Sequence, residues 1–241
     1  MNNIINENKK NIELIRKDIS IYYDKLSKQL NDLKINNKNN QEIKYNNSER
    51  NKYIGQVLNG VPEGKGIMYW NNGDKYEGEW KNDLKEGKGI YFHANGDRYE
   101  GEYRNGKIEG KGIYYYADGN RYEGEFRNGC KEGKGISYYA NGDRYEGDHR
   151  NDIKEGKGIY YFANGDRHEG EWKNDNREGK GISYYADGDR YEGDHRNGIK
   201  EGKGIYYYAN GDRMMGDYLN DKLIGKHVTL TRNGEVKIEN Y

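Results

Sequence analysis

From Tyr53 onward, this 241-residue sequence repeats itself every 23 residues without an insertion or a deletion. The segment 76–80, Tyr-Glu-Gly-Glu-Trp, returns at 99–103 as Tyr-Glu-Gly-Glu-Tyr and at 122–126 as Tyr-Glu-Gly-Glu-Phe. A Gly-Lys-Gly triplet and an Asn-Gly or Asp-Gly pair recur at the same interval. A fixed period of roughly 20–50 residues is typical of an array of small stacked units. Such an array offers one long surface, which favours binding over catalysis.

Composition alone would place the chain near the disordered class, since hydrophobic residues make up 32% and the mean hydropathy is −1.37. The regular period argues against disorder, because all 35 glycines fall within the repeats and 26 tyrosines supply bulk for a core. Residues 1–52 carry 11 basic and 7 acidic side chains, and the remainder carries 30 and 34. Without a concentrated basic excess, a nucleic-acid partner is not expected. The single cysteine and the lack of a signal peptide or long apolar run predict a cytoplasmic protein.

Each unit is predicted to form a β-hairpin, because an Asn-Gly pair between strand-like runs favours a two-residue type I′ turn. Around 95–96, this turn would pair Phe92 with Tyr99 and would place Lys88 opposite Tyr103. The expected packed face then carries Ile90, Phe92, Tyr99, Gly101 and Tyr103, and the expected outer face carries Tyr91, His93, Arg98, Glu100 and Glu102. Short variable loops, such as 81–87, would join one hairpin to the next.

The fold class expected is an all-β repeat solenoid of eight stacked 23-residue hairpin units, preceded by an amphipathic helix. The domains are a helix over 1–35, a flexible Asn- and Lys-rich linker over 36–52, and the array over 53–241 with a C-terminal capping hairpin. At two strands per unit, the rod would be roughly 80 Å long. The terminal units differ from the rest, as expected for caps: Pro62 lies in the first, and Met214 and His227 lie in the last.

Two rows on the rod are candidate binding surfaces. The first is a set of aromatic residues among charges, a combination typical of protein interfaces: Trp70, Tyr116, Tyr139, Phe162, Tyr185 and Tyr208. The second is a lysine row that anionic lipid headgroups could contact: Lys65, Lys88, Lys111, Lys134, Lys157, Lys180 and Lys203. Alternatively, the lysine stems cover aromatic rings while the charges stay in water. Neighbouring acidic residues would cancel much of the attraction to a membrane.

The segment 5–33 shows a heptad pattern typical of a helix with one apolar seam. Its expected interface residues are Ile5, Ile12, Ile15, Ile19, Tyr22, Leu26 and Leu33. A helix of this length would span about 44 Å. It would either dimerise the protein or bind a partner helix, or it would fold back onto its own solenoid as a cap.

The histidines do not form a metal or catalytic pattern. His149 and His195 stand where other units have Trp, Tyr or Phe, and His168 replaces the leading Tyr. We therefore expect them to substitute for rings in a stack. No catalytic set, metal motif or phosphate-binding loop is present in the sequence, so no enzyme activity and no cofactor is expected.

The phrase Tyr-x-Gly-x-Trp followed by Gly-x-Gly at a 23-residue period resembles the MORN family (membrane occupation and recognition nexus) over 53 to about 236. The resemblance implies a β-hairpin solenoid without catalytic activity of its own. Proteins with similar repeats include radial-spoke components of cilia, junctophilins and cytoskeletal scaffolds. The function expected is a non-enzymatic scaffold that binds other, structural proteins in a cytoskeletal or axonemal assembly, if the host is a eukaryote. The alternatives are a peripheral tether to anionic phospholipids and a regulatory subunit of an enzyme complex.

Overall fold

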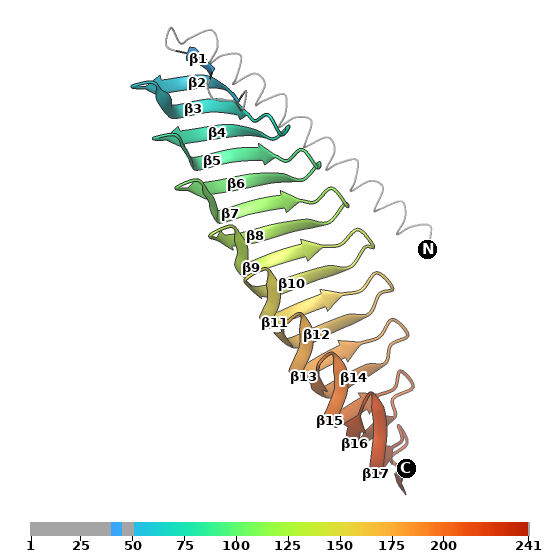
Figure 1. Cartoon of the computed structure of the whole chain (residues 1–241). Coiled ribbons are helices and arrows are strands. Elements are labelled where there is room, and N and C mark those ends of the chain that lie inside the picture. The colour runs from blue at the N-terminus through green and yellow to red at the C-terminus, as the bar shows by residue number, and fades with distance from the viewer. Residues whose placement is uncertain (1–39, 45–50, 241) are drawn as a thin grey trace, which may run out of the picture.

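The computed structural model describes residues 40–44 and 51–240, which form one antiparallel sheet of 18 strands. Each strand pairs with its neighbours in sequence, so that the first pairs only with the second and the last only with the one before it (Figure 1). The strands are β1 Asn40–Lys44, β2 Lys52–Leu58, β3 Val61–Tyr69, β4 Lys75–Lys81, β5 Leu84–Phe92, β6 Arg98–Arg104, β7 Lys107–Tyr115, β8 Arg121–Arg127, β9 Cys130–Tyr138, β10 Arg144–Arg150, β11 Ile153–Tyr161, β12 Arg167–Lys173, β13 Asn176–Tyr184, β14 Arg190–Arg196, β15 Ile199–Tyr207, β16 Arg213–Leu219, β17 Lys222–Leu230 and β18 Val236–Asn240.

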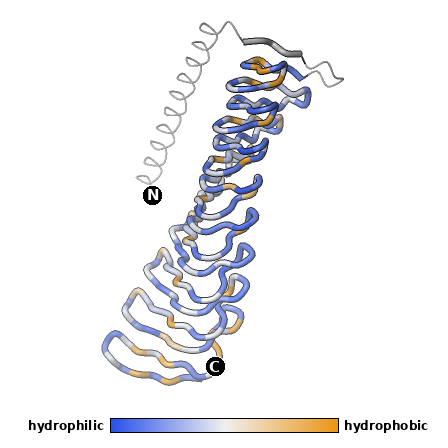
Figure 2. Tube along the Cα trace, turned by 90° about the vertical axis from the view of Figure 1, so that its left-hand side faces the viewer, coloured by the Kyte–Doolittle hydropathy of each residue, from blue (hydrophilic) through white to orange (hydrophobic). Residues whose placement is uncertain are grey.

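The strands stack as rungs of an elongated array that twists gradually from β2 to β17 (Figure 1). Hydrophobic positions recur among hydrophilic ones along its whole length (Figure 2). The prediction of an all-β array of hairpin units is confirmed, and the part of the chain described contains no helix. The predicted N-terminal helix lies outside the described residues. Within the stretch expected to be a linker, Asn40–Lys44 form β1 instead and pair with β2.

The predicted two-residue turn at the Asn-Gly pairs is wrong. His93 donates its N–H to the Asp97 carbonyl at 2.9 Å, so that the connection is a five-residue loop. Of the pair 95–96, Gly96 alone has a positive φ (96°), whereas a type I′ turn needs two such residues. The tight turns connect the strands at their opposite ends, in the stretches expected to be variable loops. There Asn105 and Gly106 have φ values of 49° and 80°.

The longer loop shifts the strand pairing by one residue and changes which side chains share a face. Tyr91 pairs with Tyr99, and Lys88 pairs with Glu102 rather than with Tyr103. What we call the aromatic face carries Gly89, Tyr91, Tyr99, Gly101 and Tyr103, and what we call the groove face carries Lys88, Ile90, Phe92, Arg98, Glu100 and Glu102. The prediction that Ile90 and Phe92 share the packed face with Tyr99 is therefore wrong.

The core of the array consists of tyrosine rings that each cover a pair of glycines. Tyr99 is fully buried, and its hydroxyl donates to the Glu102 carbonyl at 3.2 Å. A Cβ on Gly112 would lie 2.4 Å from the Tyr99 hydroxyl oxygen. In the last unit the ring and the glycine are lost together: Met214 stands in place of the tyrosine, and His227 stands in place of the glycine. Glycine is thus required where a ring lies over the backbone.

Strand β5 bends toward the aromatic face. The Lys85 Nζ lies 4.3 Å from the centre of the Tyr91 ring, although the two residues are six positions apart on β5. In a straight strand their Cα atoms would be about 20 Å apart. The bend lies between them at Gly87, whose φ is 60°. Side chains from the two ends of the strand therefore converge on one filled aromatic layer.

Carboxylates accept hydrogen bonds from the next unit at both ends of the strands. At the five-residue loops, Asp97 accepts the Ala117 N–H at 2.7 Å and the Tyr114 hydroxyl at 3.2 Å. At the tight turns, Glu86 accepts the Asn105 N–H at 2.9 Å. The hydrogen bond from the Ala117 N–H is the first cause that lowers the pKa of Asp97.

Replacing Asp97 by alanine is expected to destabilise the array by about 1–2 kcal/mol, because two donors in the next unit lose their acceptor. Asp97→Asn is the matched control. In the following unit, Asn120 already accepts the Ala140 N–H at 2.8 Å through its amide oxygen. Urea unfolding measures both variants, and an Asn variant as unstable as the Ala variant would contradict this role.

Candidate interaction surfaces

A groove runs along the groove face through nearly all units. Its N-terminal section, lined by residues between 54 and 136, has a volume of about 940 Å³, and its C-terminal section, lined by residues between 134 and 217, has about 1350 Å³. The two sections share Lys134 and Ile136. The paired glycines contribute backbone to the lining, and equivalent side chains return in each unit. The groove is therefore a continuous, periodic surface.

The lysine row predicted as a lipid contact lines this groove, and all seven of its side chains are exposed. Every one of these lysines pairs across the sheet with an acidic residue. Lys134 forms an ion pair with Asp148 at 3.1 Å, and Lys180 forms one with Asp194 at 3.5 Å. The lysines and their acidic partners thus form a ladder of alternating charges. The acidic residues offset the attraction of the lysines for an anionic surface.

Two further rows accompany the lysine ladder on the groove face. In the first, isoleucine alternates with glutamate, as in the pairing of Glu100 with Ile90 and with Ile113. In the second, arginine alternates with tyrosine: the Arg98 guanidinium carbon lies 4.2 Å from the centre of the Tyr115 ring. Arg98 also pairs with Glu100 at 2.9 Å. The groove face therefore offers apolar, cationic and anionic groups in every unit.

The six aromatic residues predicted as a partner-binding row lie elsewhere. The shifted pairing places them near the five-residue loops, half-buried against tyrosines of the aromatic face. Their ring centres lie 4.5 to 5.9 Å from those tyrosines: Trp70 on Tyr91, Tyr116 on Tyr114, Tyr139 and Phe162 on Tyr160, and Tyr185 and Tyr208 on Tyr206. They are therefore part of a ring stack and not of the charged rows. Their role in binding stays a prediction.

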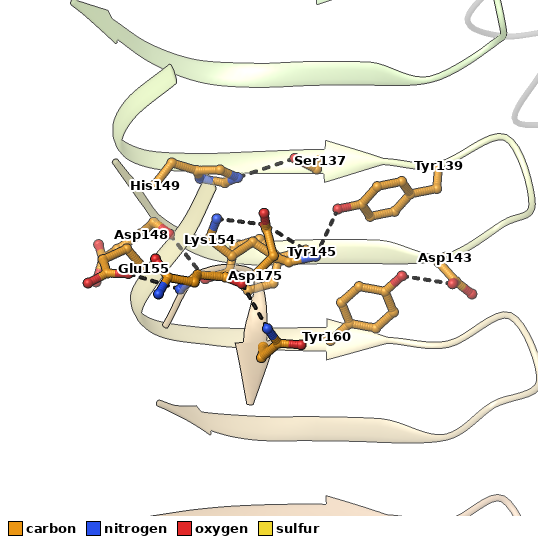
Figure 3. Close-up of polar contacts among 12 residues, drawn as sticks. Ser137, Tyr139, Asp143, Tyr145, Asp148, His149, Lys154, Glu155, Tyr160 and Asp175 are labelled. Atoms are coloured by element: carbon orange, nitrogen blue, oxygen red, sulfur yellow. Dashed lines mark hydrogen bonds and ion pairs between the residues drawn. The ribbon is translucent and has the colours of Figure 1, made fainter. Parts of the chain in front are cut away.

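The aromatic face holds cations of its own, which the sequence analysis missed because their positions were assigned to variable loops. Figure 3 shows Lys154, whose Nζ lies 5.3 Å from the Tyr160 ring centre and 5.7 Å from that of Tyr145. It also donates to the Tyr139 hydroxyl at 3.4 Å and pairs with Asp175 at 3.8 Å. Lys85, Lys131 and Lys200 occupy equivalent places. Burial lowers the pKa of Lys85 and that of Lys131. Internal lysines thus fill the space between these rings.

Three histidines stand within the ring stack, which confirms the prediction that they replace aromatic residues. The His149 ring lies 4.9 Å from the Tyr122 ring, and the His168 ring lies 4.7 Å from the His195 ring. Burial lowers the pKa of His149 and of His195 to about 4, and that of His168 to about 3. The His149 Nε2 lies 3.3 Å from the Ser137 hydroxyl (Figure 3). All three rings are therefore neutral at pH 7.

In residues 40–44 and 51–240, no three His, Cys, Asp or Glu side chains gather where they could hold a metal ion. A helix with the length and apolarity needed to cross a membrane is likewise not found in these ranges.

Comparison with known proteins gives both a family and a fold. A sequence profile of the MORN repeat matches seven consecutive segments: 53–75, 76–98, 99–121, 122–144, 145–167, 168–190 and 191–213. No curated protein matches the chain. Among solved structures, the wild-type TCP10 domain of Danio rerio CPAP is 10% identical with a TM-score of 0.50, over 83% of this chain and 94% of that chain.

Two further solved structures give lower scores. The G-box domain of the microcephaly protein CPAP is 11% identical with a TM-score of 0.40, over 84% of this chain and 99% of that chain. The TCP10c domain of Drosophila melanogaster Sas-4 is 15% identical with a TM-score of 0.29, over the same shares. The likeness to the Danio rerio domain concerns the fold alone, and these two scores carry no argument.

Proposed function

The chain belongs to the MORN repeat family, and from this premise we propose that it is a non-enzymatic scaffold that binds other proteins along its groove. The observation that carries the proposal is the continuity of the groove, which repeats the same lining in unit after unit over two joined sections. A small molecule would contact one unit of such a surface. A protein segment that follows the array would contact many equivalent units at once. Because simultaneous contacts raise the overall affinity, the groove favours an elongated partner.

The chemistry of the groove supports a protein partner. Each inner unit contributes an isoleucine that a partner would bury, an arginine stacked on an aromatic ring, and charges of both signs. Arginine and aromatic residues are enriched at protein interfaces. The alternating charges would fix the register of the partner and disfavour a partner of one uniform charge. We place this scaffold in the cytoplasm, in a cytoskeletal or axonemal assembly, because such assemblies contain proteins with similar repeats.

Detergent extraction of the native cells tests the proposal, with blotting of the soluble, membrane and detergent-resistant fractions. We expect the protein in the detergent-resistant fraction. A variant with Ile182→Asp and Ile205→Asp, both in the groove lining, should move to the soluble fraction. The matched control is Leu84→Asp with Leu219→Asp, which changes two exposed apolar residues outside the groove lining and should stay in the pellet.

Other fractionation results would overturn the proposal. Release of the wild-type protein with the membrane fraction, together with binding to vesicles that contain phosphatidylserine, would favour a lipid tether. Equal release of both double variants would show that the groove has no special role. The melting temperature of each purified variant shows whether a change in fraction reflects unfolding.

A further inference from the structure

One row of the groove face has a spacing that matches another part of this chain. Isoleucines recur once per unit along the groove: Ile90 is buried, with 9% exposure, and the others are half-buried. The row includes Ile67, Ile90, Ile113, Ile136 and Ile159. Neighbouring strands lie about 4.8 Å apart, so that two strands per unit give a spacing of about 9.6 Å. Any rigid element that covers this row must present an apolar group at nearly the same interval.

The heptad pattern of segment 5–33 provides that interval. Seven residues of an α-helix advance by about 10.5 Å. The segment has five apolar residues at this spacing, enough to reach the first five of the seven isoleucines between Ile67 and Ile205: Ile5, Ile12, Ile19, Leu26 and Leu33. The difference of about 1 Å per unit accumulates to about 4 Å over four intervals, which side-chain rotamers can absorb. A helix of this segment would thus place one apolar residue on each unit.

Chain connectivity and charge favour this occupant. The strand β1 starts at Asn40 and pairs with β2, so that segment 5–33 enters the array at its first unit. A helix of about 44 Å that runs back along the array would cover between four and five units. Residues 1–52 carry 11 basic and 7 acidic side chains, whereas the remainder carries 30 and 34. The two parts therefore have opposite net charges of equal size.

We propose that residues 5–33 form a helix that lies in the groove of the same chain, antiparallel to the direction of the array. The expected neighbours are Leu33 with Ile67, Leu26 with Ile90, Ile19 with Ile113, Ile12 with Ile136, and Ile5 with Ile159. This helix covers the N-terminal section of the groove. It leaves most of the C-terminal section, lined by residues between 134 and 217, open to another protein.

Thiol crosslinking in the full chain tests the expected neighbours. In a Cys130→Ser background, the pair Ile19→Cys and Ile113→Cys is treated with a short bismaleimide. We expect a crosslink within one chain, seen as a monomer whose two cysteines are joined in one crosslinked peptide. The pair Ile19→Cys and Ile182→Cys is the matched control, because its second site lies three units further along, about 29 Å away. Equal crosslinking of both pairs would overturn the proposal, and so would crosslinked dimers of the Ile19→Cys variant.

Hydrogen exchange gives a second, independent measurement on the full chain. Ile12→Asp with Ile19→Asp disrupts the apolar seam, and amide exchange in the segment 88–136 should become faster. Leu14→Asp with Ile21→Asp adds the same charges outside the seam and should leave that exchange unchanged. Faster exchange in both variants, or in neither, would overturn the proposal. These outcomes do not depend on a partner, so that they are separate from a failure of the proposed scaffold function.

Discussion

Gly89→Ala is expected to destabilise the array by about 3 kcal/mol, at the upper end of the usual range for an overpacked core. The new Cβ would lie 2.3 Å from the Tyr76 hydroxyl oxygen and 2.5 Å from two carbons of the ring. Tyr76 cannot move away, because it is fully buried and its hydroxyl donates to the Glu79 carbonyl at 3.1 Å. Urea unfolding of the purified full chain measures the loss.

Two comparisons show whether the ring above Gly89 causes this loss. Gly181 occupies the same place under the smaller His168 ring, where the nearest atom would be 2.6 Å from a new Cβ. Gly181→Ala should therefore cost less than Gly89→Ala. Adding Tyr76→Met to Gly89→Ala imitates the last unit and should cost less than the sum of the two single changes. Equal losses at Gly89 and Gly181, or simple additivity, would contradict the account of the core.

Acid is expected to destabilise the middle of the array through the buried histidines. Because the pKa of each ring is lower when folded than when unfolded, the unfolded chain binds more protons in acid. The stabilisation is fully present above about pH 6.5 and is lost as the pH falls toward 4 for His149 and His195, and toward 3 for His168. A shift from about 6.5 to about 4 corresponds to about 3 kcal/mol per ring.

Urea unfolding at pH 7 and pH 4.5 measures this dependence. The matched variant replaces the three histidines by rings that stand at the same places in other units: His149→Phe, His168→Tyr and His195→Tyr. Its stability should fall much less between the two pH values than that of the wild-type chain. An identical fall in both proteins would show that other groups cause the acid sensitivity.

The sequence predicted the type of fold because the 23-residue period and the glycine and tyrosine positions leave few alternatives. It did not predict the strand pairing. In the run Ile90-Tyr91-Phe92, three apolar residues are adjacent, so that alternation fits two registers that differ by one residue. The choice depends on the backbone conformation of the loop. The long loop at 93–97 and the tight turn at 105–106 both contain an Asn-Gly pair, and the pair alone does not distinguish them.

The candidate surfaces were predicted less completely than the fold, for the same reason. The lysine row is exposed, as its polarity suggested. Its members pair across the sheet with acidic residues, however: Lys88 pairs with Glu102 and not with Tyr103. The row from Trp70 to Tyr208 was expected among charges, and the register shift moves it to the aromatic face. Lys85 reaches Tyr91 because its strand bends at Gly87, and a periodicity argument for straight strands does not include such a contact.

The central claim is that the groove face, and not the aromatic face, binds a partner protein. Photo-crosslinking in the native cells tests it most directly, with p-benzoylphenylalanine placed in the full chain at Ile182 or Ile205, or at Tyr185 or Tyr208. Our account predicts crosslinks to one and the same protein from both groove positions and none from the two tyrosine positions. Crosslinks from Tyr185 and Tyr208 alone would contradict the account and would support the binding row first expected from the sequence.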